Sequence, residues 1–363
     1  MESVTHAVLG VSLGELIAGK KLGYKAALYG AMLETIPDLD YIFFPLLTHE
    51  EQLGFHRSAT HSLLFSVVAP LIIIPIVNKL FAFARTLDFK THYFLIFIAF
   101  FTHIVLDCFT TYGTLVFWPF SDYQASFDNI SIFDPMYTLP LLIGLSLTWY
   151  CRRKNLSGDH KRFQHFNAIG LTLSVVYLAS TFVVKSHVNH VFAEQLDKQQ
   201  ITYSAIDSFP TIGNNILWRG IASVADGYYE GLYSIFDGDH EVKWHRIARH
   251  EELLEKYKDT VIVQTLKWRT MGLYSVSATE NGIAMHDLKF GNLYYGLPET
   301  DWVYSYTVEG TPEHYSFETK TADYSHGISP VYLRHVFFPR IRGDKVSFYN
   351  NLPGIGLMLT HKK

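Results

Sequence analysis

The chain has few cysteines and few charged residues. Only two of its 363 residues are Cys, and only 18% are Asp, Glu, Lys or Arg. Cys108 and Cys151 lie at opposite ends of their apolar segments, so we do not expect them to form a disulfide. The net charge of −4, without a basic stripe, argues against a nucleic-acid partner. The first residues also lack the basic start of a secretory signal peptide, and His6 interrupts their apolar run.

Long apolar runs take the place of charge in the first half of the chain. A helix needs about 20 apolar residues to span a membrane, or about 17 at the short end. Four segments approach this length: residues 62–82, 92–109, 137–151 and 167–184. Two shorter segments rich in Gly and Ala precede them, residues 5–18 and 24–35. Because Gly10, Gly14 and Gly30 permit close helix packing, these two segments should form a hairpin inside the bundle.

The two halves of the chain differ in pattern, and we predict two domains. Residues 1–185 should form an α-helical membrane bundle of four spans plus the N-terminal helical hairpin. Residues 186–363 should form a smaller, mixed α+β domain, mainly antiparallel sheet, because short β-like runs alternate there with Gly, Asn and Pro. Residues 260–266 and 301–308 are two such runs, and residues 244–258 have a helical pattern.

Lys and Arg are unevenly distributed among the connections between the apolar segments. Residues 36–60 carry Arg57 alone, and residues 110–134 carry no Lys or Arg. The other three connections hold eleven: Lys20, Lys21, Lys25, Lys79, Arg85, Lys90, Arg152, Arg153, Lys154, Lys161 and Arg162. The positive-inside rule places these basic connections in the cytoplasm. We therefore predict a multi-pass protein of the inner (cytoplasmic) membrane, with the second domain on the extracytoplasmic side.

A histidine and an aspartate share one face of the second long apolar segment. His103 and Asp107 are four residues apart, which puts both on one side of a helix. One interpretation is a hydrogen bond that satisfies a buried imidazole. Ionisable groups within membrane segments are costly and usually functional, however, so we favour a role as metal ligands.

Two carboxylates follow the hairpin. Pro37 should end the preceding helix, and Asp38 and Asp40 then lie on the same side of an extended stretch. They could belong to a solvated turn or cap a helix. They could also bridge two metal ions, or one could bind an ion while the other orients a histidine.

The segment between these carboxylates and the first long span contains His56, Arg57 and His61. A spacing of five on a helix would point the two rings about 140° apart, so we expect a break near residues 58–60. Ser58 or Thr60 should cap the following span. Arg57 could neutralise Asp38 or Asp40, or it could clamp a phosphate or carboxylate of a substrate.

All these groups should meet at the extracytoplasmic face, where His6 begins the first helix. Imidazole and carboxylate are the ligands of zinc or manganese, and we expect one or two divalent ions. The predicted metal ligands are His6, Asp38, Asp40, His56, His61, His103 and Asp107. Asp134 precedes Pro135 on the same side, and could be a ligand, a residue that orients one, or a helix cap.

These motifs occur in a recognisable order. The order Thr5-His6, Pro37-Asp38-Leu39-Asp40, His56-Arg57, Thr60-His61-Ser62, His103-x-x-x-Asp107 and Asp134-Pro135 resembles the membrane-bound metal-dependent hydrolase family, inner-membrane hydrolases of bacteria and archaea. The resemblance covers about residues 1–185 and implies a metal-dependent hydrolase with its metal bound by the seven residues above. Lipid phosphatases of the phosphatidic-acid type share the His-x-x-x-Asp pair, but their basic motif and their Pro-Ser-Gly-His motif are absent here.

The leading functional hypothesis is hydrolysis by a metal-activated water. Asp38 or Asp107 would act as general base, with Arg57 also in the catalytic set. The lipid bilayer is the expected partner, and the substrate would be a lipid-linked or outer-compartment ester or phosphoester. The alternative is a non-catalytic, metal-containing membrane protein for binding or transport. More His and Asp are present than the four ligands of a closed structural zinc site, which favours an open or dinuclear site.

Overall fold

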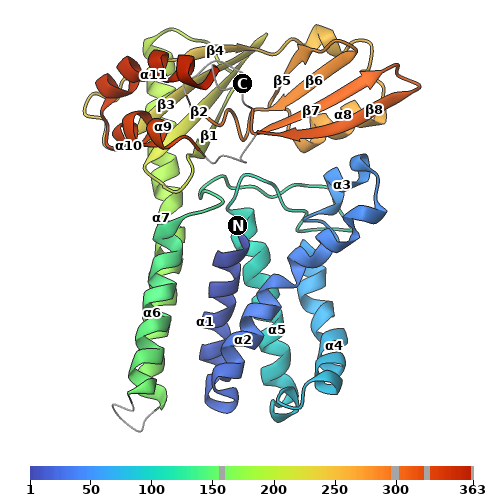
Figure 1. Cartoon of the computed structure of the whole chain (residues 1–363), viewed down its shortest axis with the longest axis vertical. Coiled ribbons are helices and arrows are strands. Elements are labelled where there is room, and N and C mark those ends of the chain that lie inside the picture. The colour runs from blue at the N-terminus through green and yellow to red at the C-terminus, as the bar shows by residue number, and fades with distance from the viewer. Residues whose placement is uncertain (155–159, 296–301, 323–327, 361–363) are drawn as a thin grey trace. The chain divides into compact units, whose positions relative to one another are not determined.

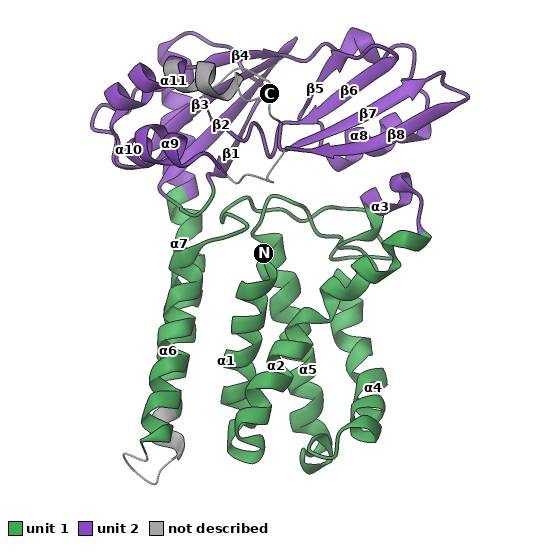
Figure 2. Cartoon of the chain, viewed as in Figure 1, with its two compact units in different colours: residues 1–46, 54–184, 212–215 green, residues 47–53, 185–211, 216–363 purple. Residues whose placement is uncertain are grey.

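A computed structural model describes residues 1–154, 160–295, 302–322 and 328–360. The chain divides into two compact units (Figure 2). Unit 1 contains residues 1–46, 54–184 and 212–215. Unit 2 contains residues 47–53, 185–211 and 216–363. Unit 1 is helical, and unit 2 contains all the named strands of the described residues.

The predicted apolar segments of unit 1 all form helices (Figure 1). These are α1 (Ser3–Leu22), α2 (Tyr24–Thr35), α4 (Leu63–Leu80), α5 (Phe89–Cys108), α6 (Pro135–Arg153) and α7 (His160–Lys198), the last of which continues into unit 2. Shorter elements connect them: η1 (Pro37–Leu46), α3 (His49–Phe55), η2 (Ala59–His61) and η3 (Ala84–Thr86). Among the described residues, three helices are long and apolar enough to cross a membrane: α4, α5 and α7 from Gln164. Since α6 is not among them, the predicted count of four spans is not confirmed.

The chain enters α4 and η1 in ways that differ from the predictions. A break does separate His56 from His61, but the side chain of Ser62, and not that of Ser58 or Thr60, accepts the hydrogen bond from Phe65 N that caps α4 (3.0 Å). The stretch with Asp38 and Asp40 is a 3₁₀-helix and not extended.

The hairpin of α1 and α2 is packed as closely as its glycines suggest. A Cβ atom on Gly10 would lie 2.3 Å from the Gly30 carbonyl oxygen, and one on Gly30 would lie 2.0 Å from the Gly10 carbonyl oxygen. Only glycine permits such an approach of two backbones. The predicted close packing is confirmed, although α1 has 20 residues and is longer than expected.

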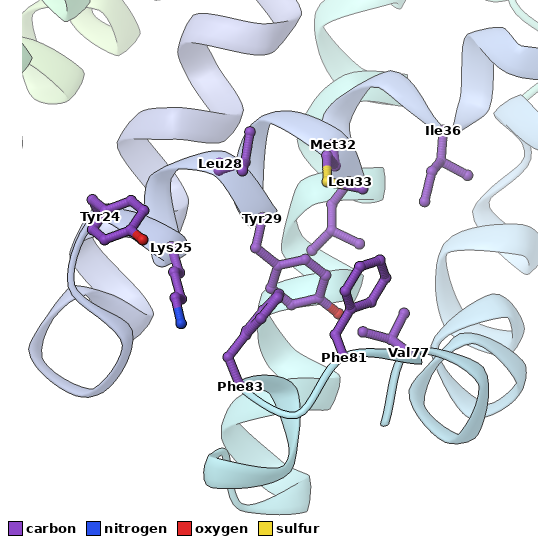
Figure 3. A pocket seen from close by; sticks show the side chains of 10 residues that line it. All are labelled: Tyr24, Lys25, Leu28, Tyr29, Met32, Leu33, Ile36, Val77, Phe81 and Phe83. Carbon is purple, nitrogen blue, oxygen red and sulfur yellow. The ribbon is translucent and has the colours of Figure 1, made fainter. Parts of the chain in front are cut away.

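An apolar cavity of about 240 Å³ lies between α2 and the end of α4 (Figure 3). Tyr29, Phe81 and Phe83 turn toward one another there, and Lys25 is the only charged residue in its lining. None of the predicted metal ligands lines this cavity. It is therefore separate from the candidate site described below.

Unit 2 contains two four-stranded antiparallel sheets, as the predicted fold class requires. The first has the order β1-β2-β3-β4, with bounds Ala205–Pro210, Leu217–Val224, Gly227–Ser234 and His245–Ala248. The second has the order β5-β6-β7-β8, with bounds Tyr274–Ala278, Gly282–Asp287, Tyr304–Gly310 and Tyr315–Thr321. The remaining elements are η4 (Glu251–Leu254), α8 (Val261–Arg269), α9 (Pro330–Tyr332), η5 (Leu333–Phe337), α10 (Phe338–Ile341) and α11 (Lys345–Thr360). In the second sheet Ile283 pairs with Val308.

Two predicted elements of unit 2 have the wrong type. Residues 261–266 belong to helix α8, Thr260 is its N-cap, and Ile262, Val263 and Leu266 are fully buried. Positions 262, 263 and 266 fall on one helical face, so core packing overrides the β preference of the branched side chains. Residues 244–258, predicted as a helix, instead form β4 and η4.

A polar cavity of about 430 Å³ lies beside the second sheet. His286 in its lining sits between two hydroxyl groups, 2.9 Å from Ser277 Oγ and 2.8 Å from Ser305 Oγ. Its ring stacks on Trp302 with the ring centroids 5.1 Å apart. The imidazole is thus held by contacts on both nitrogens and on one face.

Candidate metal centre

Four of the predicted ligands converge in unit 1. They are Asp38 of η1, His61 of η2, and His103 and Asp107 of α5, and one ligand atom from each lies within 4.8 Å of all the others. The side chains of His61, His103 and Asp107 are at most 1% exposed, whereas Asp38 is 18% exposed. The cluster is thus buried and meets solvent only through Asp38.

The distances between the ligand atoms match a small coordination sphere. The Nε2 atoms of His61 and His103 are 3.1 Å apart, and Asp38 Oδ1 lies 3.4 and 3.5 Å from them. Asp107 Oδ2 lies 3.4 and 3.7 Å from the same two nitrogens. Metal–ligand bonds of about 2.0–2.1 Å in a tetrahedron give distances between ligands of about 3.3–3.4 Å. The five distances above lie within about 0.4 Å of this value, as expected for a site that could hold a zinc-sized ion.

Each histidine of the cluster has its other nitrogen occupied. His103 Nδ1 lies 2.7 Å from the Glu34 carbonyl oxygen, which can only accept a hydrogen bond, so the proton is on Nδ1. His61 Nδ1 lies 3.0 Å from Thr60 Oγ1, and that hydroxyl donates to Asp40 Oδ2 at 3.0 Å. Such contacts fix the tautomer and leave each Nε2 lone pair for a ligand.

The donor set also fits an ion by its chemistry. When both rings are neutral with the proton on Nδ1, their Nε2 lone pairs face each other at 3.1 Å and neither nitrogen has a proton to donate. Asp107 Oδ2 is buried and has no hydrogen-bond partner among the described residues. A divalent cation would satisfy both lone pairs and the carboxylate oxygen at once.

A second cluster contains a residue that the sequence predictions missed. His6, Glu34 and His103 also place one ligand atom each within 4.8 Å of one another. Glu34 Oε2 lies 3.4 Å from His6 Nδ1 and 3.5 Å from His103 Nδ1, and the two rings stack 3.8 Å apart. Glu34 is fully buried near the end of α2, four residues before Asp38. A glutamate at the end of a helix that is rich in apolar residues was the available signal.

His6 also contacts the first cluster. Its Nε2 atom lies 3.2 Å from Asp107 Oδ1, the oxygen that points away from His61 and His103. The amino group of Met1 contacts the same oxygen and lies 3.2 Å from His6 Nε2. Asp107 therefore links the two clusters.

The predicted ligands Asp40 and His56 lie beside the four-residue cluster but are not members of it. His56 Nδ1 is 2.9 Å from Asp40 Oδ1, and the other oxygen of Asp40 accepts the Thr60 hydrogen bond. Burial lowers the pKa of His56 to about 4, although the Asp40 hydrogen bond acts in the opposite direction.

Arg57 is buried and pairs with a different carboxylate from those predicted. Its Nη2 atom lies 3.1 Å from Asp107 Oδ1, and its Nη1 atom donates to Thr110 Oγ1 at 2.9 Å. The neutralisation of Asp38 or Asp40 that was one interpretation is not seen, because the end of α5 places Asp107, and the residues after it place Thr110, at the guanidinium.

Asp134 serves as a helix cap. One carboxylate oxygen accepts the Met136 N–H at the start of α6 (2.9 Å), and the other accepts the Tyr177 hydroxyl of α7 (2.7 Å). Both oxygens are thus engaged in holding helices, so of the roles considered for Asp134 the cap is the one seen.

Comparison with known proteins identifies relatives of the helical half. The profile of the YdjM inner membrane protein family matches residues 1–188. The chain is 29% identical over 161 residues to the uncharacterized protein YfhP of Bacillus subtilis (strain 168), covering 41% of this chain and 46% of YfhP. It is 31% identical over 123 residues to the inner membrane protein YbcI of Escherichia coli (strain K12), covering 33% of this chain and 68% of YbcI. No solved structure matches the chain significantly.

These matches support part of the resemblance seen in the motifs. Relatives described as inner membrane proteins, together with several apolar helices, indicate a multi-pass protein of the inner membrane. The chain spans about half the length of YfhP, and no description of a relative mentions hydrolysis or metal. The profile matches 188 of the 363 residues, which shows that the chain belongs to the YdjM inner membrane protein family.

Proposed function

We propose that the protein is a membrane-bound, metal-dependent hydrolase. The observation that carries the proposal is the near-tetrahedral spacing of Asp38, His61, His103 and Asp107 at 3.1–3.7 Å. Two histidines and two carboxylates with these spacings are a ligand set for zinc. Since His103 Nδ1 is already engaged by the Glu34 carbonyl oxygen, we assign one ion to the site and a supporting role to Glu34 and His6.

Each residue then has a distinct role. A bound divalent ion lowers the pKa of water toward about 7 and polarises the bond to be cleaved. Asp38 would be the general base, because it is the most exposed carboxylate of the cluster. Its departure from the ion would leave three protein ligands and open the fourth position to the water. Asp40 holds His61 in place through Thr60. His56 holds Asp40.

A substrate within the membrane suits the surroundings of Asp38. The same 3₁₀-helix, η1, exposes a row of large apolar side chains: Leu39, Tyr41, Ile42, Phe43 and Leu46. Exposed apolar groups beside a buried polar site favour contact with lipid over contact with water. We therefore infer a lipid-linked ester or phosphoester as substrate, with α6 as a fourth span and the site and unit 2 on the extracytoplasmic side.

Metal analysis of the detergent-purified protein tests the site. We expect about one transition metal ion per chain, most of which is lost in the His61→Ala/His103→Ala double variant. His314→Ala, at an exposed histidine of unit 2, is the matched control and should retain the metal. Full metal occupancy in the double variant would sink the assignment.

A screen with generic carboxylic esters and phosphoesters then tests the activity. Three of the four ligands are buried, which would also suit a structural ion in a binding or transport protein. A metal-loaded protein that is inert toward every ester and phosphoester would favour that non-catalytic alternative.

A further inference from the structure

We propose that Arg57 binds an anionic oxygen of the substrate, which makes the substrate class a phosphoester and not a carboxylic ester. This inference rests on the proposed hydrolase function and narrows it. It is carried by the contacts of Arg57, by its backbone conformation and by its position next to Asp107.

The guanidinium of Arg57 is buried, and its Nε–H donor is unused. The residue is 4% exposed, and its two terminal nitrogens contact Asp107 Oδ1 at 3.1 Å and Thr110 Oγ1 at 2.9 Å. The Nε atom is buried and has no hydrogen-bond partner among the described residues. An unpaired buried donor on a charged group is costly, so this N–H indicates an acceptor that binds from outside the chain.

The backbone at Arg57 has a strained conformation. Arg57 has φ +62°, in the left-handed region that residues other than Gly rarely adopt. Its carbonyl oxygen accepts a hydrogen bond from Leu115 N (2.9 Å), and its guanidinium lies over the Tyr112 ring, 4.8 Å from the centroid. Such strain persists where surrounding contacts hold it, and it concentrates at functional sites.

Asp107 places the guanidinium next to the metal cluster. Its Oδ1 atom pairs with Arg57, while its Oδ2 atom faces His61 Nε2 at 3.4 Å and His103 Nε2 at 3.7 Å. A substrate group that contacts the cluster is therefore separated from Arg57 by little more than the carboxylate of Asp107. A group with two free oxygens can reach both.

This geometry discriminates between the two ester classes. A phosphoester carries negative charge on oxygens that are not esterified, and guanidinium groups recognise such oxygens through paired N–H donors. A carboxylic ester has a single neutral carbonyl oxygen and offers no anionic oxygen to the unpaired Nε–H of Arg57. Hydrolysis of a phosphomonoester forms a P–O bond to water and breaks the P–O bond to the alcohol. One proton of the water goes to the general base and the alcohol leaves with a proton, so Arg57 binds without exchanging one.

Inorganic phosphate is the probe that tests Arg57. Its affinity is measured by calorimetry on the zinc-loaded, full-length protein in detergent, with metal content determined for each sample. Arg57→Asn removes the guanidinium and keeps a residue type that tolerates positive φ. We expect it to weaken phosphate binding about 10- to 100-fold at unchanged metal content. Arg57→Lys should lose less, and Arg153→Gln, at an exposed arginine, should bind like the wild type.

The outcomes separate this inference from the proposed function. A metal-loaded wild type that binds no phosphate, or cleaves only carboxylic esters, would overturn the inference and leave the hydrolase intact. Equal phosphate affinity in fully loaded Arg57→Asn would overturn it as well. If Arg57→Asn does not fold, Arg57→Lys provides the test. A phosphate affinity equal to that of the wild type would overturn the role of the paired N–H donors of the guanidinium. A wild type without metal would remove the proposed function itself.

Discussion

Asp38 and Asp107 belong to the same cluster but differ in exposure. Asp38 is 18% exposed and can exchange a proton with solvent, whereas Asp107 is 1% exposed and paired with Arg57. Asp38→Asn should therefore lower hydrolysis about 100-fold or more when metal content is normal. Asp107→Asn should instead lose metal. Rates and metal content of both variants check this, and an active, metal-loaded Asp38→Asn would move the role of base to another carboxylate such as Asp40.

Asp40 should act on the metal indirectly. Its oxygens hold His56 and Thr60, and Thr60 in turn contacts His61. Loss of a residue that orients a ligand usually costs about 10- to 100-fold in metal affinity or activity. Asp40→Asn should therefore weaken zinc binding by about 10-fold, measured by competition with a chelator of known affinity. An unchanged zinc affinity would show that His61 is positioned without Asp40.

His286 in unit 2 should make the protein sensitive to acid. Burial lowers its pKa to about 4, from 6.5 in an unfolded chain. As pH falls from about 6.5 to about 4, His286 binds a proton in the unfolded state but not in the folded state. The free energy of unfolding therefore decreases over this pH range, by up to about 3 kcal/mol. Thermal unfolding between pH 7 and pH 4 should show a shallower loss for His286→Gln than for the wild type, and parallel curves would contradict this.

The contact between α1 and α2 depends on glycine. Because a Cβ on Gly10 would lie 2.3 Å from a backbone oxygen of α2 and 2.8 Å from Glu34 Cγ, Gly10→Ala must push the two helices apart. Overpacking of this kind typically costs about 1–3 kcal/mol. We expect a lower melting temperature and reduced zinc content. Gly238→Ala is the control, since nothing lies within 4 Å of its added Cβ, and equal melting temperatures of the two variants would contradict the prediction.

The elements that were predictable from the sequence are those with strong local signals. Residues 24–35 form α2 as predicted, and the run at 301–308 contains most of β7, because hydrophobic pattern and turn residues agree there. Residues 260–266 were misread because their burial against the rest of unit 2 decides between helix and strand. The same limit applies to the site. Residue spacing indicated His61 and His103, but only the fold shows that Glu34 lies beside His103 and that Arg57 pairs with Asp107.

The orientation of the whole molecule follows from its basic connections and can be measured. Three connections contain eleven Lys and Arg residues, whereas the other two connections together contain one. The positive-inside rule therefore predicts an extracytoplasmic C-terminus. A C-terminal reporter that is active only in the cytoplasm should be silent, and one that is active only outside should give signal. Strong cytoplasmic signal would reverse the orientation and place the metal cluster on the cytoplasmic side.

The four ligands come from three elements of the chain, η1, η2 and α5, and His61 and His103 are 42 residues apart. An unfolded chain cannot bring them together, so an ion that binds here binds the native state by preference and shifts the folding equilibrium by mass action. At an ion concentration about 1,000 times the dissociation constant, this linkage adds about 4 kcal/mol. Chelation should therefore lower the melting temperature, and cells starved of zinc should accumulate less of the protein in their membranes.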